Sequence, residues 1–278
     1  MIEARQVGLT IDQSTVVNQM TFTFSEPGLY GIIGPNGAGK TSLLRLMSGA
    51  AQPTFGSMLL NGRPIGDYPR KTLARTMAVL QQGGLPSVGF SVRETVGMGR
   101  FAYQGWFGDE REDPTPLIDS ALRRMGLTEL QHRSLDRLSG GERQRAALAQ
   151  IMVQNPQIML LDEPTTYLDI GYQLQLLDTV REWQRERGMI VAAVLHDLNL
   201  ASLYCDHLLV MKDGSLYASG KPRDVITKEL VRAVYNAEAE VIYAEDDGTP
   251  QIVLRRAGQL SKEPSSSEPN PFMQLIGR

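Results

Sequence analysis

The eight residues from 34 to 41, GPNGAGKT, constrain the fold more than any other part of this 278-residue chain. A short apolar run, 29–33, precedes them, and a segment with helical character, 41–48, follows. Glycines let the backbone turn tightly and bring its N–H groups towards an anion, and the N-terminal end of the helix adds partial positive charge. The pattern therefore predicts a buried parallel strand that ends in a phosphate-binding loop.

The side chains of this loop suit a nucleoside triphosphate. Lys40 can place its charge on the β- and γ-phosphates, and the Thr41 hydroxyl can ligate Mg²⁺. We therefore expect ATP and Mg²⁺ as the cofactors, although the motif alone specifies only a phosphate-binding NTPase. The candidate nucleotide contacts are Gly34, Pro35, Asn36, Gly37, Ala38, Gly39, Lys40, Thr41 and Ser42.

A second motif, IMLLDEP at 158–164, reads as a buried strand followed by two carboxylates. Ligands of open parallel sheets bind outside the carboxyl ends of the strands, where Asp162 is expected. Asp162 is placed to hold Mg²⁺. Glu163 is placed to act as a general base or to orient a water that attacks the γ-phosphorus.

A third motif, LSGGERQ at 138–144, begins a predicted helix. Ser139 and Glu142 have the spacing of a capping box, and Gly140 and Gly141 leave the start of the helix unobstructed. A helix start of this kind is a second anion site. Because the chain already has one for its own nucleotide, this one suits a nucleotide held by another subunit, with Ser139, Gly140, Gly141 and Glu142 as contacts.

In this order, the three motifs resemble the Walker A, signature and Walker B motifs of ABC-type ATPases. Gln82 resembles the Q-loop glutamine of that family, with Gln81 as the alternative register. Asp169 resembles the D-loop aspartate, and His196 resembles the switch histidine. The resemblance covers residues 2–230 and implies catalytic roles for Glu163, His196, Gln82 and Asp169, with Mg²⁺ held by Thr41, Gln82 and Asp162.

The resemblance also implies the architecture. We expect an α/β fold whose P-loop NTPase (RecA-like) core spans about 26–82 and 157–225. An antiparallel β subdomain would use the alternating N-terminal strands and residues 57–60, and a helical subdomain would be inserted at about 83–156. Together they form a nucleotide-binding domain, 1–230.

The remaining residues read as a short appendage. Residues 231–260 are expected to form a small C-terminal extension. A helix is expected over 225–235, where this extension begins. A hairpin is expected to pair 241–243 with 252–254. Residues 261–278 include SKEPSSSEPNP, which is too polar to pack a core, so we expect a disordered tail.

Composition narrows the function classes. Twenty-eight Lys and Arg against 31 Asp and Glu give a net charge of −3, which is not the basic excess of a general nucleic-acid binder. The single cysteine cannot form an internal disulfide, which indicates a reducing compartment. The sequence has neither a signal-peptide pattern nor a run of the ~18 apolar residues that a bilayer crossing requires. These observations predict a soluble protein in a reducing cytosol, and the resemblance implies a peripheral position at the cytoplasmic face of the cell membrane.

Two further segments indicate a subgroup. SVRETVGMGR at 91–100 and HDLNLA at 196–201 are similar to ATPase subunits that serve iron–siderophore, haem and cobalamin uptake. The similarity implies an importer subunit that forms a homodimer through shared ATP and works with two transmembrane permease subunits and, indirectly, a substrate-binding protein. The alternatives are an exporter ATPase and a non-transport ABC ATPase acting on nucleic acid. The latter class commonly has coiled-coil insertions, tandem nucleotide domains, zinc cysteines or a basic arm, and this sequence has none of them.

Two local expectations follow from the resemblance. The helical subdomain would receive a coupling helix of the permease, for which the candidate groove residues are Phe101, Tyr103, Trp106 and Phe107. Packing within the subdomain, or a place in a mobile loop, is the alternative for these aromatic residues. In addition, Ile11 stands where the family often has an aromatic residue that stacks on adenine, so we expect apolar packing against the base at that position.

Overall fold

The computed structural model describes residues 1–83, 85, 89–105, 110, 112–166 and 168–254. At its centre lies a six-stranded sheet in the order β10-β9-β3-β8-β7-β6. All neighbouring strands are parallel except β9 and β10, which form a hairpin. The strands are β3 (Gly28–Ile33), β6 (Met77–Leu80), β7 (Ile158–Asp162), β8 (Ile190–Val194), β9 (His207–Lys212) and β10 (Ser215–Gly220). The expected parallel core is confirmed.

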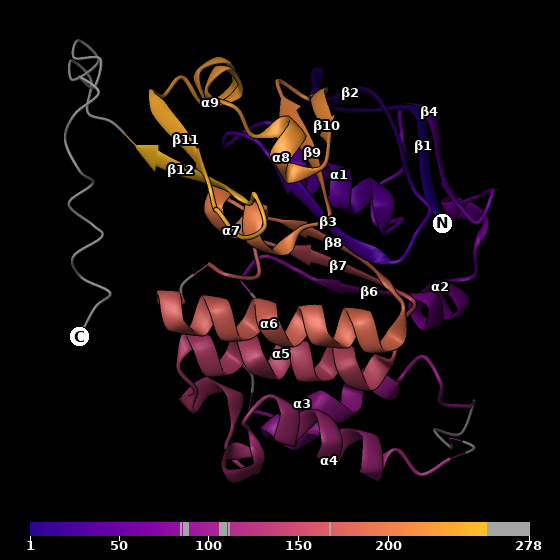
Figure 1. Cartoon of the computed structure of the whole chain (residues 1–278). Coiled ribbons are helices and arrows are strands. Elements are labelled where there is room, and N and C mark those ends of the chain that lie inside the picture. The colour runs from indigo at the N-terminus through magenta and orange to yellow at the C-terminus, as the bar shows by residue number, and fades with distance from the viewer. Residues whose placement is uncertain (84, 86–88, 106–109, 111, 167, 255–278) are drawn as a thin grey trace, which may run out of the picture.

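Both faces of this sheet are buried, and successive residues of each strand face opposite layers. On β7, Ile158 and Leu160 belong to one apolar cluster, whereas Met159 and Leu161 belong to the other. The first cluster is shared with an antiparallel sheet and α1 (Lys40–Met47), and the second is shared with the helices α3 to α9. The central sheet is therefore the middle layer of the molecule (Figure 1).

The antiparallel sheet has the order β2-β1-β4-β5. Its strands are β1 (Ile2–Ile11), β2 (Ser14–Phe24), β4 (Phe55–Leu60) and β5 (Arg63–Pro64). Between the two sheets, α1 follows β3 directly, so the phosphate-binding loop lies at the carboxyl end of a central strand. A short helix, α2 (Arg70–Thr76), leads back into the central sheet at β6.

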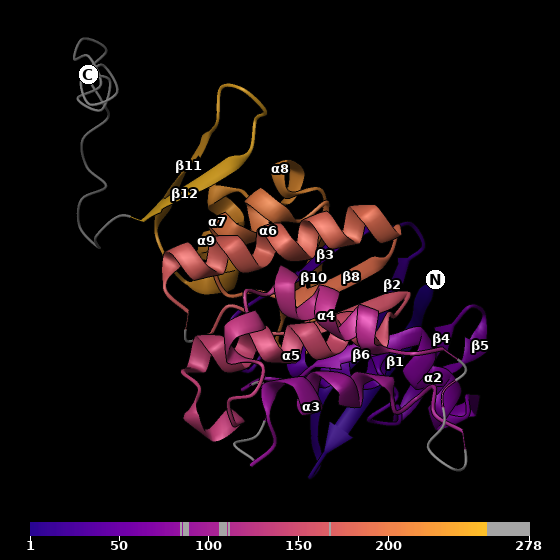
Figure 2. The ribbon, with the colours of Figure 1, turned by 90° about the horizontal axis from the view of Figure 1, so that it is seen from below.

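The segment between β6 and β7 is helical. It contains α3 (Val92–Gly97), α4 (Thr115–Arg124) and α5 (Gly140–Gln154). A 3₁₀ turn follows α3, and two more lie between α4 and α5. Helix α5 contacts both α3 and α4. Figure 1 shows these helices on the opposite side of the central sheet from the antiparallel sheet, with α6 (Ile170–Arg187) between α5 and the central sheet. The view from below shows α6, α5 and α3 lying side by side (Figure 2). This arrangement agrees with the expected inserted helical subdomain.

The C-terminal region differs from the expectation in one respect. The predicted single helix over 225–235 is wrong: α8 (Pro222–Val225) ends at Val225, and α9 (Lys228–Tyr235) begins only after a break. The break arises because Ile226 is extended and the Thr227 hydroxyl caps α9 by accepting a hydrogen bond from the N–H of Leu230.

The predicted hairpin is confirmed as β11 (Ala239–Tyr243) paired with β12 (Pro250–Leu254). Asn199 of α7 (Leu198–Tyr204) holds it in place, because its side-chain oxygen accepts from the N–H of Ile252 at 2.7 Å and its amide donates to the carbonyl of Ile252 at 3.3 Å. The tail predicted to be disordered lies outside the described residues. Over the ranges that are described, no helix combines the length and the apolar character needed to cross a bilayer.

Candidate active site

The phosphate-binding loop surrounds a pocket of about 280 Å³. Lys40 is only 6% exposed, and its ammonium group donates hydrogen bonds to the carbonyls of Gly34, at 2.8 Å, and Pro35, at 2.9 Å. The loop thus curls around the lysine, with backbone carbonyls beneath its charge. The pocket is lined by Val16, Asn36, Gly37, Ala38, Gly39, Lys40, Thr41, Ser42 and Glu163.

Close packing explains one glycine of the loop. Gly39 has a φ of +93°, and a β-carbon there would lie 2.2 Å from the carbonyl oxygen of Val16. The strand β2 therefore approaches the loop as closely as a glycine permits. Val16 lines the nucleotide pocket, a placement that sequence reasoning missed, since its only sequence signal is an apolar residue in an alternating strand.

The same strands place Ile11 away from the pocket around the phosphate loop. Ile11 is 43% exposed at the end of β1, opposite Ser14 across a tight turn, and it does not line the pocket. Both turn residues, Asp12 and Gln13, have positive φ, so the chain reverses immediately after Ile11. The apolar side chain beside the phosphate loop is that of Val16, on the other strand of the hairpin.

Asp162 ends β7 next to the loop, as expected. The Thr41 hydroxyl donates to its carboxylate at 3.1 Å. Burial raises the pKa of the Asp162 carboxyl above its ordinary value, although the hydrogen bond from Thr41 acts in the opposite direction. Burial likewise lowers the pKa of Lys40, against the opposing effect of the carboxylates of Glu163 and Asp162. Such a pocket favours a ligand that brings anionic oxygens to Lys40 and a cation to Asp162.

Glu163 is the centre of the hydrogen-bond network. His196 Nε2 lies 2.6 Å from Glu163 Oε1, and Gln82 donates its amide to Glu163 Oε2 at 2.9 Å. Thr166, which the sequence analysis did not single out, donates its hydroxyl to the same oxygen at 3.2 Å. Partial burial acts to raise the pKa of Glu163, but the contacts with His196, Thr166 and Gln82 together lower it below the ordinary value. The carboxylate is therefore held in its charged form.

The network also selects between the two glutamines. Gln82, two residues beyond β6, reaches Glu163, whereas Gln81 is exposed and makes no such contact. The structure therefore favours Gln82 as the Q-loop glutamine.

The signature segment, residues 138–144, does not line the pocket around Lys40. The Ser139 hydroxyl accepts from the N–H of Glu142 at 3.2 Å, and the Glu142 carboxylate accepts from the N–H of Ser139 at 2.7 Å, so the expected capping box is confirmed. That backbone hydrogen bond lowers the pKa of Glu142. Ser139 and Gly140 are exposed, Gly141 is half-buried, and none of the three lines the pocket around Lys40.

Asp169 caps the next helix. It is exposed, and its carboxylate accepts from the N–H of Tyr172 at 3.0 Å, which makes it the N-cap of α6. This contact gives Asp169 a structural role in the single chain. Within the chain, the structure brings Gln82, Glu163 and His196 together beside the phosphate loop and leaves Ser139 and Asp169 facing solvent.

The fold and this constellation define a phosphate-loop nucleoside triphosphatase, because a loop that binds phosphates, a carboxylate at the end of another strand of the same sheet and a charged glutamate lie together. The family model described as ABC transporter matches residues 17–166. The chain belongs to the ABC transporter family and is of its ATP-binding type.

Curated relatives cover most of the chain. The ferric enterobactin transport ATP-binding protein FepC of Escherichia coli is 38% identical over 91% of this chain and 93% of its own length. The hemin import ATP-binding protein HmuV of Rhodopseudomonas palustris is 41% identical over 86% of this chain and 90% of its own length. Some relatives are longer, and the chain spans 59% of the length of one of them.

A solved structure of a metal-chelate type ABC transporter, in an inward-facing conformation, has the same fold. Its TM-score is 0.79 at 22% identity, and the match covers 92% of this chain and 98% of that one. The expected fold class is thereby confirmed.

Proposed function

We propose that this chain hydrolyses ATP to power import of an iron–siderophore-type chelate, with haem or cobalamin as the alternative cargo. The observation that carries the ATPase part is the charged Glu163, held by His196 and Gln82 beside the phosphate loop. The import part is supported by the similarity to FepC and HmuV, which are named for transport of ferric enterobactin and import of hemin.

In the proposed reaction, a water attacks the γ-phosphorus, the bond between that phosphorus and the bridging oxygen breaks, and ADP leaves. Glu163 accepts the proton of the water, because its lowered pKa keeps it ionised near neutral pH. Lys40 would leave the carbonyls of Gly34 and Pro35 and place its charge on the β- and γ-phosphates. His196, one hydrogen bond from Glu163, would reach the γ-phosphate.

The donor set beside the loop fits Mg²⁺. The Thr41 hydroxyl and the Asp162 carboxylate lie 3.1 Å apart, and both are the oxygen ligands that Mg²⁺ prefers. The side chain of Gln82 can add an amide oxygen. When bound, the ion would neutralise charge on the β- and γ-phosphate oxygens.

The exposed signature segment supports a second copy as partner. Ser139 and Gly140 begin a capped helix, face solvent and lie away from the pocket of their own chain. In a head-to-tail homodimer they would meet the γ-phosphate bound by the other chain, and Asp169 would lie at the same interface. ATP then joins the two chains, and hydrolysis removes the link.

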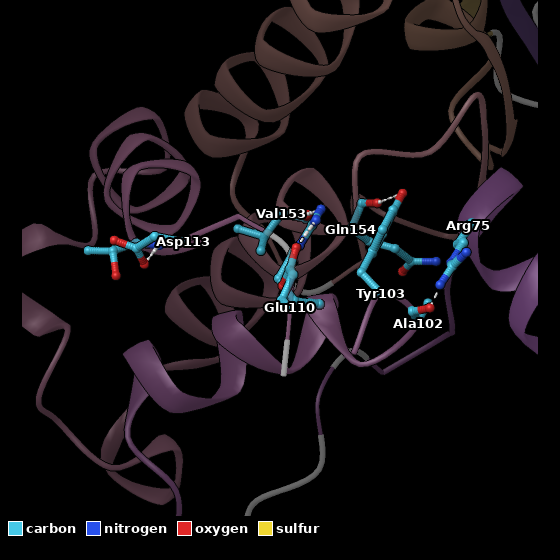
Figure 3. A network of polar contacts seen from close by, with 9 residues as sticks. Arg75, Ala102, Tyr103, Glu110, Asp113, Val153 and Gln154 are labelled. Carbon is cyan, nitrogen blue, oxygen red and sulfur yellow. Dashed lines mark hydrogen bonds and ion pairs between the residues drawn. The ribbon is translucent and has the colours of Figure 1, made fainter. Parts of the chain in front are cut away.

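A groove near the helical segment supports docking of a permease. It has a volume of about 780 Å³ and lies between α2 and the segment after α3, with Lys71, Arg75, Tyr103 and Glu110 among its lining residues. Arg75 donates to the carbonyl of Ala102 at 2.8 Å (Figure 3). The carboxylate oxygen Oε2 of Glu110 is buried without a hydrogen-bond partner in the described parts of the chain, so a donor on a docked segment would satisfy it.

The aromatic residues proposed for this groove differ in role. The Tyr103 hydroxyl donates to the carbonyl of Gln154 (Figure 3). The Arg100 guanidinium lies over the Tyr103 ring, 3.8 Å from its centroid, so Tyr103 packs against its own chain. Phe101 is 59% exposed and is free to contact a partner. Trp106 and Phe107 lie outside the described residues. Docking on two permease chains would hold this protein at the cytoplasmic face of the membrane. A substrate-binding protein would be an indirect partner, because it would act through the permease.

The test is uptake by the complete complex of this chain with its permease, reconstituted in vesicles and supplied with binding protein. Ferric siderophores, haem, cobalamin and free metal ions form the panel, and Glu163→Gln is the inactive control. ATP-dependent uptake of a ferric siderophore is expected. Uptake of a sugar or an amino acid instead would overturn the cargo, and ATP-dependent movement outwards would establish the exporter alternative.

A further inference from the structure

The backbone that carries Glu163 is unusual and needs support. Glu163 has a φ of +52°, a left-handed conformation that residues with a β-carbon rarely adopt. Pro164 follows it, so the next residue has no N–H with which to hold the turn. Pro164 is buried, and a buried carbonyl requires a hydrogen-bond donor.

That donor comes from α5, the helix that begins within the LSGGERQ motif. Gln144 is 8% exposed in the second turn of α5, and its amide donates to the carbonyl of Pro164 at 2.9 Å. A second contact lies one turn earlier, where a β-carbon on Gly141 would be 3.2 Å from Leu168. The start of α5 therefore packs directly on the segment that follows Glu163.

We propose that Gln144 is a positioning residue that couples the two ATP sites of the dimer. The inference rests on the proposed head-to-tail homodimer. There, Ser139 at the start of α5 would contact the nucleotide of the partner chain, whereas Glu163 would act on the nucleotide of its own chain. The Gln144–Pro164 hydrogen bond joins the two elements. Nucleotide bound at Ser139 thus fixes, through Gln144, the backbone conformation of Glu163 in the other ATP site.

The decisive variant is Gln144→Met, which keeps the volume and removes the donor. Gln184→Met is its matched control, because Gln184 is 4% exposed on α6 and donates to the carbonyl of Met189 at 3.1 Å. Both variants lose one buried amide-to-carbonyl hydrogen bond, and Gln184→Met also loses the hydrogen bond that Arg181 donates to Gln184 at 3.3 Å. Only the bond of Gln144 lies beside Glu163, so the control perturbs the fold at least as much without touching the site. ATPase rate, KM, Hill coefficient and Tm are measured on the full chain.

For Gln144→Met, we expect a loss of about tenfold or more in kcat and a fall of the Hill coefficient towards unity. KM for ATP is expected to stay within about twofold, because the phosphate loop is untouched. Gln184→Met should lower Tm comparably while keeping kcat and the Hill coefficient. Gln144→Asn retains the amide but is one methylene too short, so it should repeat the kinetic loss if Gln144→Met does not fold.

Three outcomes would overturn the coupling. An unchanged kcat and Hill coefficient in both Gln144 variants would do so while leaving the ATPase and the dimer intact. An equal kinetic loss in Gln184→Met would reduce the role of Gln144 to general stability. A parent chain that hydrolyses ATP without cooperativity and as a monomer would remove the proposed dimer itself, and the coupling with it.

Discussion

His196 Nε2 lies 2.6 Å from one carboxylate oxygen of Glu163, and the amide of Gln82 donates to the other oxygen at 2.9 Å. The three residues follow β8, β7 and β6, which are neighbouring parallel strands. The glutamate is therefore held from both sides by groups on different strands. A shift of either outer strand end relative to β7 would change both the orientation and the pKa of Glu163.

Replacing Glu163 by Gln removes the proposed base while preserving the size of the side chain. We expect the variant to bind ATP, to accumulate closed dimers and to lose about 10²-fold or more in turnover. Phosphate release and size-exclusion chromatography with ATP measure the two effects. Glu182→Gln, on an exposed side chain of α6, is the control. Hydrolysis near the parent rate would show that Glu163 is not the base.

His196→Ala is expected to move the acid limb of the pH–rate profile. Glu163 must be ionised to act, and its contact with His196 lowers its pKa. Without His196 the pKa of Glu163 rises, so activity is lost at a higher pH as the solution is acidified. The measurement is kcat at saturating ATP from about pH 4 to pH 8. An acid limb at the parent position would contradict the role given to this hydrogen bond.

Lys40→Ala should weaken nucleotide binding itself. The charged hydrogen bonds that Lys40 would make to phosphate are worth about 1.5–3 kcal/mol, which corresponds to a loss of roughly tenfold or more in ATP affinity. Titration with a fluorescent ATP analogue measures the effect, and Lys228→Ala, on an exposed side chain of α9, is the comparison. Equal affinities for the parent and Lys40→Ala would count against the phosphate loop.

Val16 and Ile11 allow a paired test of which strand borders the nucleotide. A carboxylate at position 16 would stand beside the phosphate loop and repel the triphosphate, so Val16→Asp should raise KM for ATP by about tenfold. Ile11→Asp, at an exposed position outside the pocket, should leave KM within about twofold. A raised KM in Ile11→Asp together with an unchanged KM in Val16→Asp would instead place Ile11 beside the nucleotide.

Asp206 is expected to stabilise the fold by an amount that depends on pH. It accepts from Arg181 at 2.5 and 2.6 Å and from the N–H of Leu29 at 2.7 Å. Burial alone would raise its pKa, but these hydrogen bonds lower it below the unfolded value. Its contribution is present above the unfolded pKa and is lost as the pH falls through the folded pKa.

Asp206→Asn should therefore reduce the free energy of unfolding by about 1–2 kcal/mol at neutral pH, an amount that allows for partial exposure of the pair. Urea denaturation at several pH values measures it, and the difference from the parent should shrink on acidification. A difference independent of pH would assign the effect to packing.

The strand-and-loop pattern around residues 29–41 predicted a strand of the parallel core, and the resemblance to ABC-type ATPases implied the antiparallel subdomain and the inserted helical subdomain. Interactions between residues close together in the sequence were also predicted. The capping box of Ser139 and Glu142 needs only a helix start. Such features depend on neighbours a few residues apart.

The sequence by itself predicted a triphosphate site at Lys40 and placed an ionisable pair, Asp162 and Glu163, at the end of a buried strand. Only the tertiary structure decided that Gln82 rather than Gln81 reaches Glu163, that Val16 lines the pocket at the phosphate loop, and that Gln144 supports Pro164. These choices depend on strand register and on the approach of segments distant in the chain. Local propensity and spacing carry no information about either.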